Sequence, residues 1–184
     1  MYAYPTNLFV ACFIGSPSMN FLTGELDDNS VKLPIGTITI PDRIRRRLQA
    51  GPGGGRRGVI AGLRPEHFED ARLVADRSHG VTFRAEIDVL EAMGSEYYAY
   101  FVVEAERVSS SELEELAADA GGADAPRSYE GSQVVARLDA ASGVRQGQEA
   151  ELWFNADHLQ LFDADSGHSL LVSDGNHAQA GDGR

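Results

Sequence analysis

Alternation of apolar and polar residues predicts that β-strands dominate this chain. The clearest case is residues 81–90, where up to Val89 every second residue is apolar and the residues between are polar or charged. Successive side chains of a strand point to opposite faces of a sheet, so the pattern predicts one buried and one exposed face. The apolar positions are Val81, Phe83, Ala85, Ile87 and Val89. Gly94 and Ser95 then supply a turn, and residues 97–103 return as the second, aromatic-rich strand of a hairpin.

Further segments have the composition and spacing of strands. They are residues 19–26, 31–40, 59–63, 134–138, 150–154 and 158–162. Within the second of these, isoleucines at 38 and 40 alternate with threonines at 37 and 39. Residues 163–167 are predicted to turn, and residues 170–172 to add a short final strand. The chain is therefore expected to be mostly β.

Two short helices are predicted among the strands. Residues 5–15 place Phe9, Cys12 and Phe13 on one helical face, which we interpret as packing surface, and a glycine and a proline at 15 and 17 end the helix. Residues 41–50 begin with Pro-Asp and predict a short arginine-rich helix or turn.

The acidic stretch at residues 104–130 departs from the strand pattern. It carries eight acidic residues and two arginines, with a capping box formed by Ser111 and Glu114. We interpret it as an exposed helix and loop inserted between strands. Residues 174–184 are polar and are expected to form a disordered tail.

Charge is distributed unevenly along the chain, whose formal net charge is −12. Residues 1–60 contain seven Lys/Arg and four Asp/Glu, a net of +3, whereas residues 61–184 contain nine and 24, a net of −15. The acidic part should repel phosphate backbones, which argues against nucleic-acid binding. The single cysteine excludes an internal disulfide and suits a reducing compartment. No apolar run approaches the roughly 20 residues of a membrane helix, and no signal peptide is expected.

No residue pattern predicts a catalytic, cofactor or metal site. Residues 51–58 have the glycines of a phosphate-binding loop, but no lysine followed by serine or threonine. The Asp163-x-Asp165 sequence begins like a calcium loop but lacks the later ligands, and the five histidines have no metal-ligand spacing. We therefore expect neither ATP hydrolysis nor another enzymatic activity from this chain.

Two groups of side chains leave a binding function open. Arginines at 43, 45, 46, 47, 56 and 57 could form a patch for an anion or a partner, or simply a solvated surface. The aromatic residues at 97, 98, 100 and 101 could stack nucleic-acid bases as in some OB folds, but one alternating pair is expected to fill the barrel interior instead.

Two strings carry a family resemblance. Residues 7–21 read NLFVACFIGSPSMNF, and residues 62–68 read GLRPEHF. Together they resemble the C-terminal regulatory segment of the ATP-binding subunit of MalK-type carbohydrate ABC importers, closest to the trehalose and maltose branch of actinobacteria. In that family a helix ending in Gly-Ser-Pro-x-Met-Asn leaves the nucleotide-binding domain, and Arg-Pro-Glu-His opens a small OB-like (TOBE) barrel.

The resemblance implies a mostly β, OB-like barrel with a short N-terminal helix and an inserted exposed helix. Residues 1–20 would be the linker helix from a nucleotide-binding domain that this chain lacks. Residues 21–173 would be the regulatory domain, with 104–130 as its insertion, and 174–184 the tail. ATP and magnesium would belong to the missing domain, so no cofactor is expected in this chain.

The same resemblance implies a non-catalytic role in coupling and stabilising the ATPase dimer. The expected partners are the chain's own ATPase domain, a second copy of the subunit, the membrane permease subunits indirectly and, in some members, regulatory proteins. The location would be cytoplasmic, at the inner face of the membrane. The candidate interface residues are Arg64, Pro65, Glu66 and His67, whose alternative role is an ion pair of Arg64 with Glu66 that braces a turn. A small oxyanion-binding module, and an OB-fold nucleic-acid binder after it, are the alternative functions.

Overall fold

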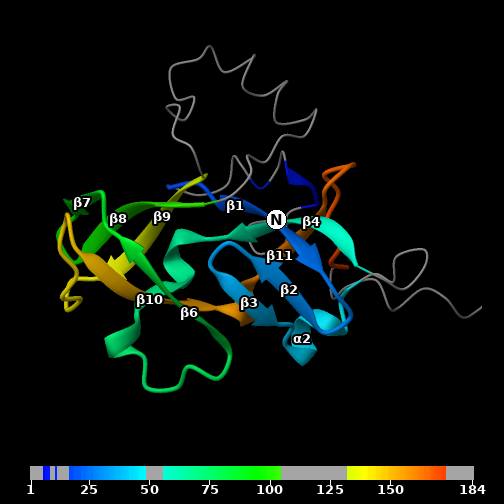
Figure 1. Ribbon diagram of the computed structural model, residues 1–184, viewed down its shortest axis with the longest axis horizontal. Coiled ribbons are helices and arrows are strands. Elements are labelled where there is room, and N and C mark those ends of the chain that lie inside the picture. The colour runs from blue at the N-terminus through cyan, green and yellow to red at the C-terminus, as the bar shows by residue number, and fades with distance from the viewer. Residues whose placement is uncertain (1–5, 9–10, 12–16, 49–55, 105–131, 173–184) are drawn as a thin grey trace, which may run out of the picture.

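The computed structural model describes residues 6–8, 11, 17–48, 56–104 and 132–172 (Figure 1). Strands make up most of these residues. They are β1 (Asn20–Leu26), β2 (Ser30–Leu33), β3 (Gly36–Thr39), β4 (Arg57–Leu63), β5 (Phe68–Asp70), β6 (Gly80–Glu86), β7 (Val89–Ala92), β8 (Glu96–Val103), β9 (Ser132–Asp139), β10 (Glu149–Asn155) and β11 (Gln160–Asp163). The helical elements are short: α2 (Asp42–Arg45), η1 (Pro65–His67), η2 (Ala71–Leu73) and η3 (Ala156–His158). The expectation of a mostly β chain is confirmed.

The strands form three antiparallel sheets. Their orders are β11-β4-β1-β2-β3, β5-β10-β6 and β7-β8-β9. In Figure 1 the five-stranded sheet lies to the right and the β7-β8-β9 sheet to the left, with β10 and β6 between them. One hydrophobic core runs through all three sheets, from Leu22 in β1 to Phe101 in β8 and Leu152 in β10. The molecule is therefore packed as one unit across its described part.

The five-stranded sheet and the β5-β10-β6 sheet exchange strands at one crossing. The chain leaves β4 through η1 and enters β5, which pairs with β10; it leaves β10 through η3 and enters β11, which pairs with β4. The registers match: Glu69 lies opposite Trp153, and Gln160 lies opposite Gly62. Glu69 precedes Gln160 by the same number of residues as Gly62 precedes Trp153, so the same offset in the sequence relates the two strand pairs to each other. The crossing thus has an approximate internal twofold symmetry, which the sequence did not reveal as a repeat.

The N-terminal segment packs on the five-stranded sheet. Leu8 and Ala11 are helical and fully buried, and they cluster with Met19, Ile60 and Phe162. The predicted helix over 5–15 is supported at these two positions. The face proposed for it, formed by residues 9, 12 and 13, lies outside the described residues, as do most of 104–130 and the tail at 174–184.

Three strand predictions need correction. Residues 31–40 form two strands rather than one, because Pro34 and Ile35 make a turn before Gly36, whose φ of 127° suits glycine alone. The alternation at 81–90 is buried only as far as Ile87; Val89 is 41% exposed because β7 belongs to the next sheet. Residues 170–172 form no strand, and only Leu171 among them makes an isolated bridge, to Leu48. Residues 41–50 do contain the expected short helix, α2.

Candidate functional site

The Arg-Pro-Glu-His segment lies at the crossing between the five-stranded sheet and the β5-β10-β6 sheet. Arg64 is extended, as the residue before a proline prefers, and η1 follows it directly. Arg64 is only 4% exposed and Pro65 is buried, whereas Glu66 and His67 are half-buried. η1 packs against β9. Only Glu66 and His67 therefore offer much surface to a partner, and the interface role of all four residues stays a prediction, as does the ion pair of Arg64 with Glu66.

His67 stacks on His158 from the matching position of η3. The ring centroids are 3.8 Å apart and the rings are inclined by only 13°. The pKa of His67 is lowered to about 4, with burial as the largest cause and the neighbouring His158 next; Glu66 opposes the shift, and Arg64 and Arg137 add to it. His67 is therefore neutral at pH 7, where the stack is a contact between flat, largely apolar rings. It links the two strand exchanges directly.

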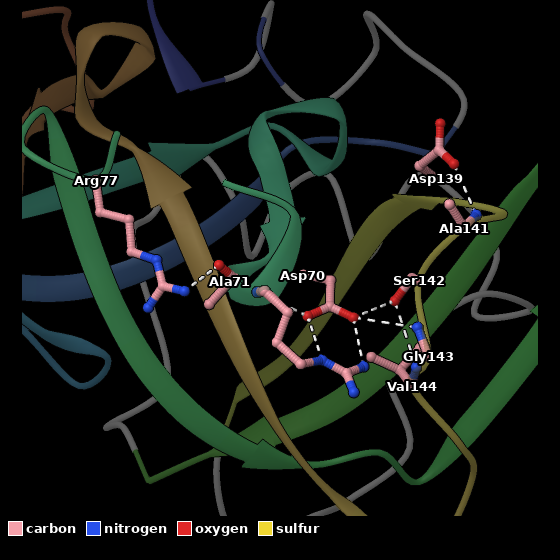
Figure 2. A network of polar contacts seen from close by, with 9 residues as sticks. Asp70, Ala71, Arg77, Asp139, Ala141, Ser142, Gly143 and Val144 are labelled. Atoms are coloured by element: carbon pink, nitrogen blue, oxygen red, sulfur yellow. Dashed lines mark hydrogen bonds and ion pairs between the residues drawn. The ribbon is translucent and has the colours of Figure 1, made fainter. Parts of the chain in front are cut away.

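Asp70, at the end of β5, forms the most concentrated polar network of the described residues (Figure 2). Its side chain is 2% exposed. Oδ1 accepts hydrogen bonds from the backbone N–H of Arg72 at 3.0 Å and from its Nε at 3.1 Å. Oδ2 accepts from Arg72 Nη2 at 2.7 Å, Ser142 Oγ at 2.9 Å and the Gly143 N–H at 3.2 Å. The carboxylate thus ties η2 to the loop between β9 and β10.

These donors hold the pKa of Asp70 well below its usual range, with the Arg72 side chain as the largest cause and burial opposing it. The loop between β9 and β10 must approach η2 closely for Ser142 and Gly143 to donate to the Asp70 carboxylate. A Cβ at Gly143 would lie 2.6 Å from Arg72 Nη2, so the guanidinium occupies the space that a larger residue would need. Gly143 is therefore part of the clamp.

Asn20 joins the five-stranded sheet to β9. Its Nδ2 donates to the carbonyls of Leu63 and Val135, both at 2.9 Å, and its Oδ1 accepts from the Val135 N–H at 2.8 Å. The side-chain amide thereby pairs with the backbone of β9 as another strand would. The preceding Met19 packs against Gly62, where a Cβ would collide with its sulfur. The sequence marked Met19 and Asn20 as part of a family string but gave no role for either.

The aromatic residues of β8 divide between the two faces of its sheet. Phe101 is fully buried, and Tyr97 packs against the core on the same side. Tyr98 and Tyr100 lie on the other side, half-buried, and the Tyr100 hydroxyl donates to Glu91 at 3.1 Å. The negative charge of Glu91 would repel the phosphate groups of a nucleic acid on this side of the sheet. The prediction that one alternating pair faces the core is confirmed.

The basic cluster serves local structure where it is described. Arg45 Nη2 donates to the Ile40 carbonyl at 3.2 Å, and the buried Arg47 donates through Nε to the Val172 carbonyl at 2.9 Å. A small pocket beside β1 and β2 is lined by two acidic and two basic side chains. Its charges therefore do not favour an anion as the ligand. It is lined by Glu25, Asp27, Ser30, Lys32, Thr37 and Arg56.

The aspartates at 163 and 165 lie in a turn rather than at a metal site. Asp163 Oδ1 accepts from the Ser166 N–H at 2.9 Å and its hydroxyl at 2.8 Å, which stabilises the turn. Among the described residues, no group of three or more His, Cys, Asp or Glu side chains is arranged to hold a metal ion. No helix in the same part of the chain is long and apolar enough to cross a membrane.

Comparison with known proteins shows that the chain is related to part of certain transporter subunits. Residues 15–68 match the MalK OB fold domain. The trehalose import ATP-binding protein SugC of Mycobacterium tuberculosis is 39% identical over 174 residues, which cover 94% of this chain and 43% of that protein. The oligosaccharides import ATP-binding protein MsmX of Bacillus subtilis is 28% identical over 166 residues, covering 90% and 38%. The chain thus spans less than half the length of these relatives.

Among solved structures, the cytoplasmic molybdate-binding protein ModG covers 77% of this chain and 94% of its own, with a TM-score of 0.46 and 12% identity. A likeness of that degree carries no argument about ligands. The match over residues 15–68 and the homology over nearly the whole chain point the same way. The chain carries a MalK-type OB fold domain and is related to the ATP-binding subunits of carbohydrate ABC importers.

Proposed function

We propose that this chain is the non-catalytic regulatory and dimerisation domain of the ATP-binding subunit of a carbohydrate importer, of the trehalose or maltose kind. The observation that carries the proposal is the 39% identity to SugC over 94% of the chain. Under this proposal ATP and magnesium are bound by another part of the subunit. The partners are that part, a second copy of the subunit and, through them, membrane permease subunits, so that the domain lies at the cytoplasmic face of the membrane.

The fold suits a part that transmits displacement without performing chemistry. Because β5 completes the sheet of β10 and β11 completes the sheet of β4, neither of these two sheets can move far without breaking ladder hydrogen bonds of the other. The histidine stack adds a side-chain link across this crossing, and the Asp70 clamp and the Asn20 bridge tie the two sheets to β9 and the loop after it. We infer that the domain moves as a rigid body when the ATPase sites open and close.

A chimeric subunit tests this proposal. The chain replaces the part of the Mycobacterium tuberculosis SugC protein to which it aligns, and trehalose uptake is measured in cells whose own SugC is absent. We expect uptake well above that of a subunit lacking this part, at equal protein abundance. Uptake no better than that of the truncated subunit, from a chimera that still hydrolyses ATP, would contradict the proposal.

A further inference from the structure

The outer side of the β7-β8-β9 sheet forms a surface rich in tyrosine and valine, here called the tyrosine face. On β8 the inward side chains of Ala99, Phe101 and Val103 are buried, so alternation turns the side chains between them outward. Val89 on β7 is 41% exposed. The tyrosine face consists of Val89, Glu91, Tyr98, Tyr100, Val102, Val135 and Arg137.

The strand register arranges this face in rows that run across the three strands. One row is Glu91, Tyr98 and Arg137, since Tyr98 pairs with both of the others. The next row is Val89, Tyr100 and Val135. A negative charge therefore lies on one edge strand and a positive charge on the other, at the same height, with tyrosine between them.

Such a row is complementary to itself. When two copies pack face to face about a twofold axis parallel to β8, the β7 strand of each copy lies over the β9 strand of the other. Glu91 of each copy then faces Arg137 of the other, and Val89 faces Val135. Tyr98 and Tyr100 of one copy then lie against Tyr98 and Tyr100 of the other copy at the twofold axis. An isologous interface needs this kind of match, in which residue i meets j and j meets i.

Both charges are available for such contacts. Glu91 is exposed, and its carboxylate accepts a hydrogen bond from the Tyr100 hydroxyl, which holds the carboxylate over the tyrosine face. The Arg137 side chain is 39% exposed and lies 3.7 Å from Glu96, an exposed ion pair of little strength. Glu96 and Asp139 form the next row at the hairpin end, where two copies would bring like charges together at the solvated rim. This repulsion limits the affinity.

The size of the face also limits the affinity. The eight residues of β8 and the width of three strands give a footprint of roughly 26 Å by 14 Å. This is well below the ~800 Å² per partner of a standard interface. Two isolated copies should therefore associate weakly, with a dissociation constant of about 0.1–1 mM.

We propose that the tyrosine face is the surface through which two copies of this chain associate, with Glu91 and Arg137 as reciprocal partners. This inference rests on the proposed dimerisation role and assigns that role to one surface. It differs from the candidate interface at Arg64 to His67, which lies at the crossing.

Charge reversal tests the pairing by sedimentation equilibrium up to about 1 mM chain. Glu91→Arg alone places Arg opposite Arg137, and Arg137→Glu alone places Glu opposite Glu91, so each variant should dimerise at least tenfold more weakly than the wild type. Mixed in equal amounts, the two variants should form a heterodimer as tight as the wild-type dimer. The double variant should regain self-association.

Matched controls separate this pairing from net charge. Glu86→Arg on β6 and Arg145→Glu in the β9–β10 loop make the same charge changes at exposed positions away from the face, and should leave dimerisation within twofold. A wild-type chain that is monomeric at 1 mM, or a variant mixture that does not associate, would overturn the inference. Neither result bears on trehalose uptake by the chimera, which tests the proposed function separately.

Discussion

Acidification from pH 7 to pH 5 should destabilise this fold through His67. The ring is stacked on His158 and partly buried, which lowers its pKa to about 4 in the folded chain. An unfolded histidine has a pKa of about 6.5. Between these two values the unfolded chain binds a proton that the folded chain does not, so stability rises with pH in this window. The contribution is fully present above pH 6.5 and is lost as the pH falls toward 4.

The magnitude follows from the two pKa values. Each proton bound by the unfolded state alone changes the free energy of unfolding by about 1.36 kcal/mol per pH unit, which gives about 1.8 kcal/mol between pH 7 and pH 5. Solvent reaches part of the His67 ring, so we reduce this to about 1 kcal/mol. The Asp70 carboxylate affects stability at a lower pH than His67 does. Because its pKa is lowered in the folded chain, its stabilisation is lost mainly below about pH 4.

Urea unfolding at pH 7 and pH 5 measures the effect. His67→Phe keeps a flat ring against His158 but cannot bind a proton, so its stability should fall by about 1 kcal/mol less than that of the wild type over this interval. Carboxylates titrate alike in both proteins, and their contribution cancels in the difference. His168→Gln, which removes an exposed histidine outside the stack, should behave as the wild type does. Equal pH dependence of the wild type and His67→Phe would refute the reasoning.

Three further substitutions test the polar links at pH 7 by the same unfolding measurement. Asp70→Asn should cost about 2–4 kcal/mol, because it removes the buried charge that satisfies Arg72 and the 142–143 loop; a loss below 0.5 kcal/mol would contradict the clamp. Gly143→Ala should cost about 1 kcal/mol by displacing the Arg72 guanidinium. The same substitution should cost less in a chain that already carries Asp70→Asn, whereas additive losses would show that the two positions act independently. Asn20→Ala should cost about 2 kcal/mol because it leaves buried backbone groups of Leu63 and β9 without their partner, and an unchanged midpoint would rule out that bridge.

Sequence patterns predicted the strands whose burial alternates within one sheet. β6, β8 and β9 alternate in burial along their length and lie where strands were predicted. The pattern failed where the chain changes sheets, as between Ile87 and Val89, because alternation reports which side is apolar but not which sheet the strand joins. The three-residue strand β5 was missed altogether. Its existence depends on pairing with β10, far along the chain, rather than on any local signal.

The family strings pointed to the right place in the fold but not to its chemistry. They drew attention to residues 62–68, which the structure places at the crossing. The partner of His67 comes from residues 156–159, where ADHL corresponds to PEHF by the internal symmetry but shares only the histidine, too little to reveal a repeat. The Asp70 clamp gave no such hint, because its donors Ser142 and Gly143 lie in a loop whose approach depends on how β9 and β10 pack.

Strand exchange and the links to β9 together explain how one small domain could connect two distant surfaces. β5 and β11 have three and four residues, too few to form stable pairs alone, so the five-stranded sheet and the β5-β10-β6 sheet each require the other. The buried Leu8 and Ala11 anchor the N-terminal segment to β4 and β11, while the tyrosine face lies on β7, β8 and β9 at the far left of Figure 1. A displacement of the N-terminal segment would therefore reach the tyrosine face through the strand exchange and then through the packing and side-chain bonds that join β9 to its neighbours, rather than through a hinge. Under the proposed function, a domain built in this way would hold two copies of the subunit at a fixed geometry.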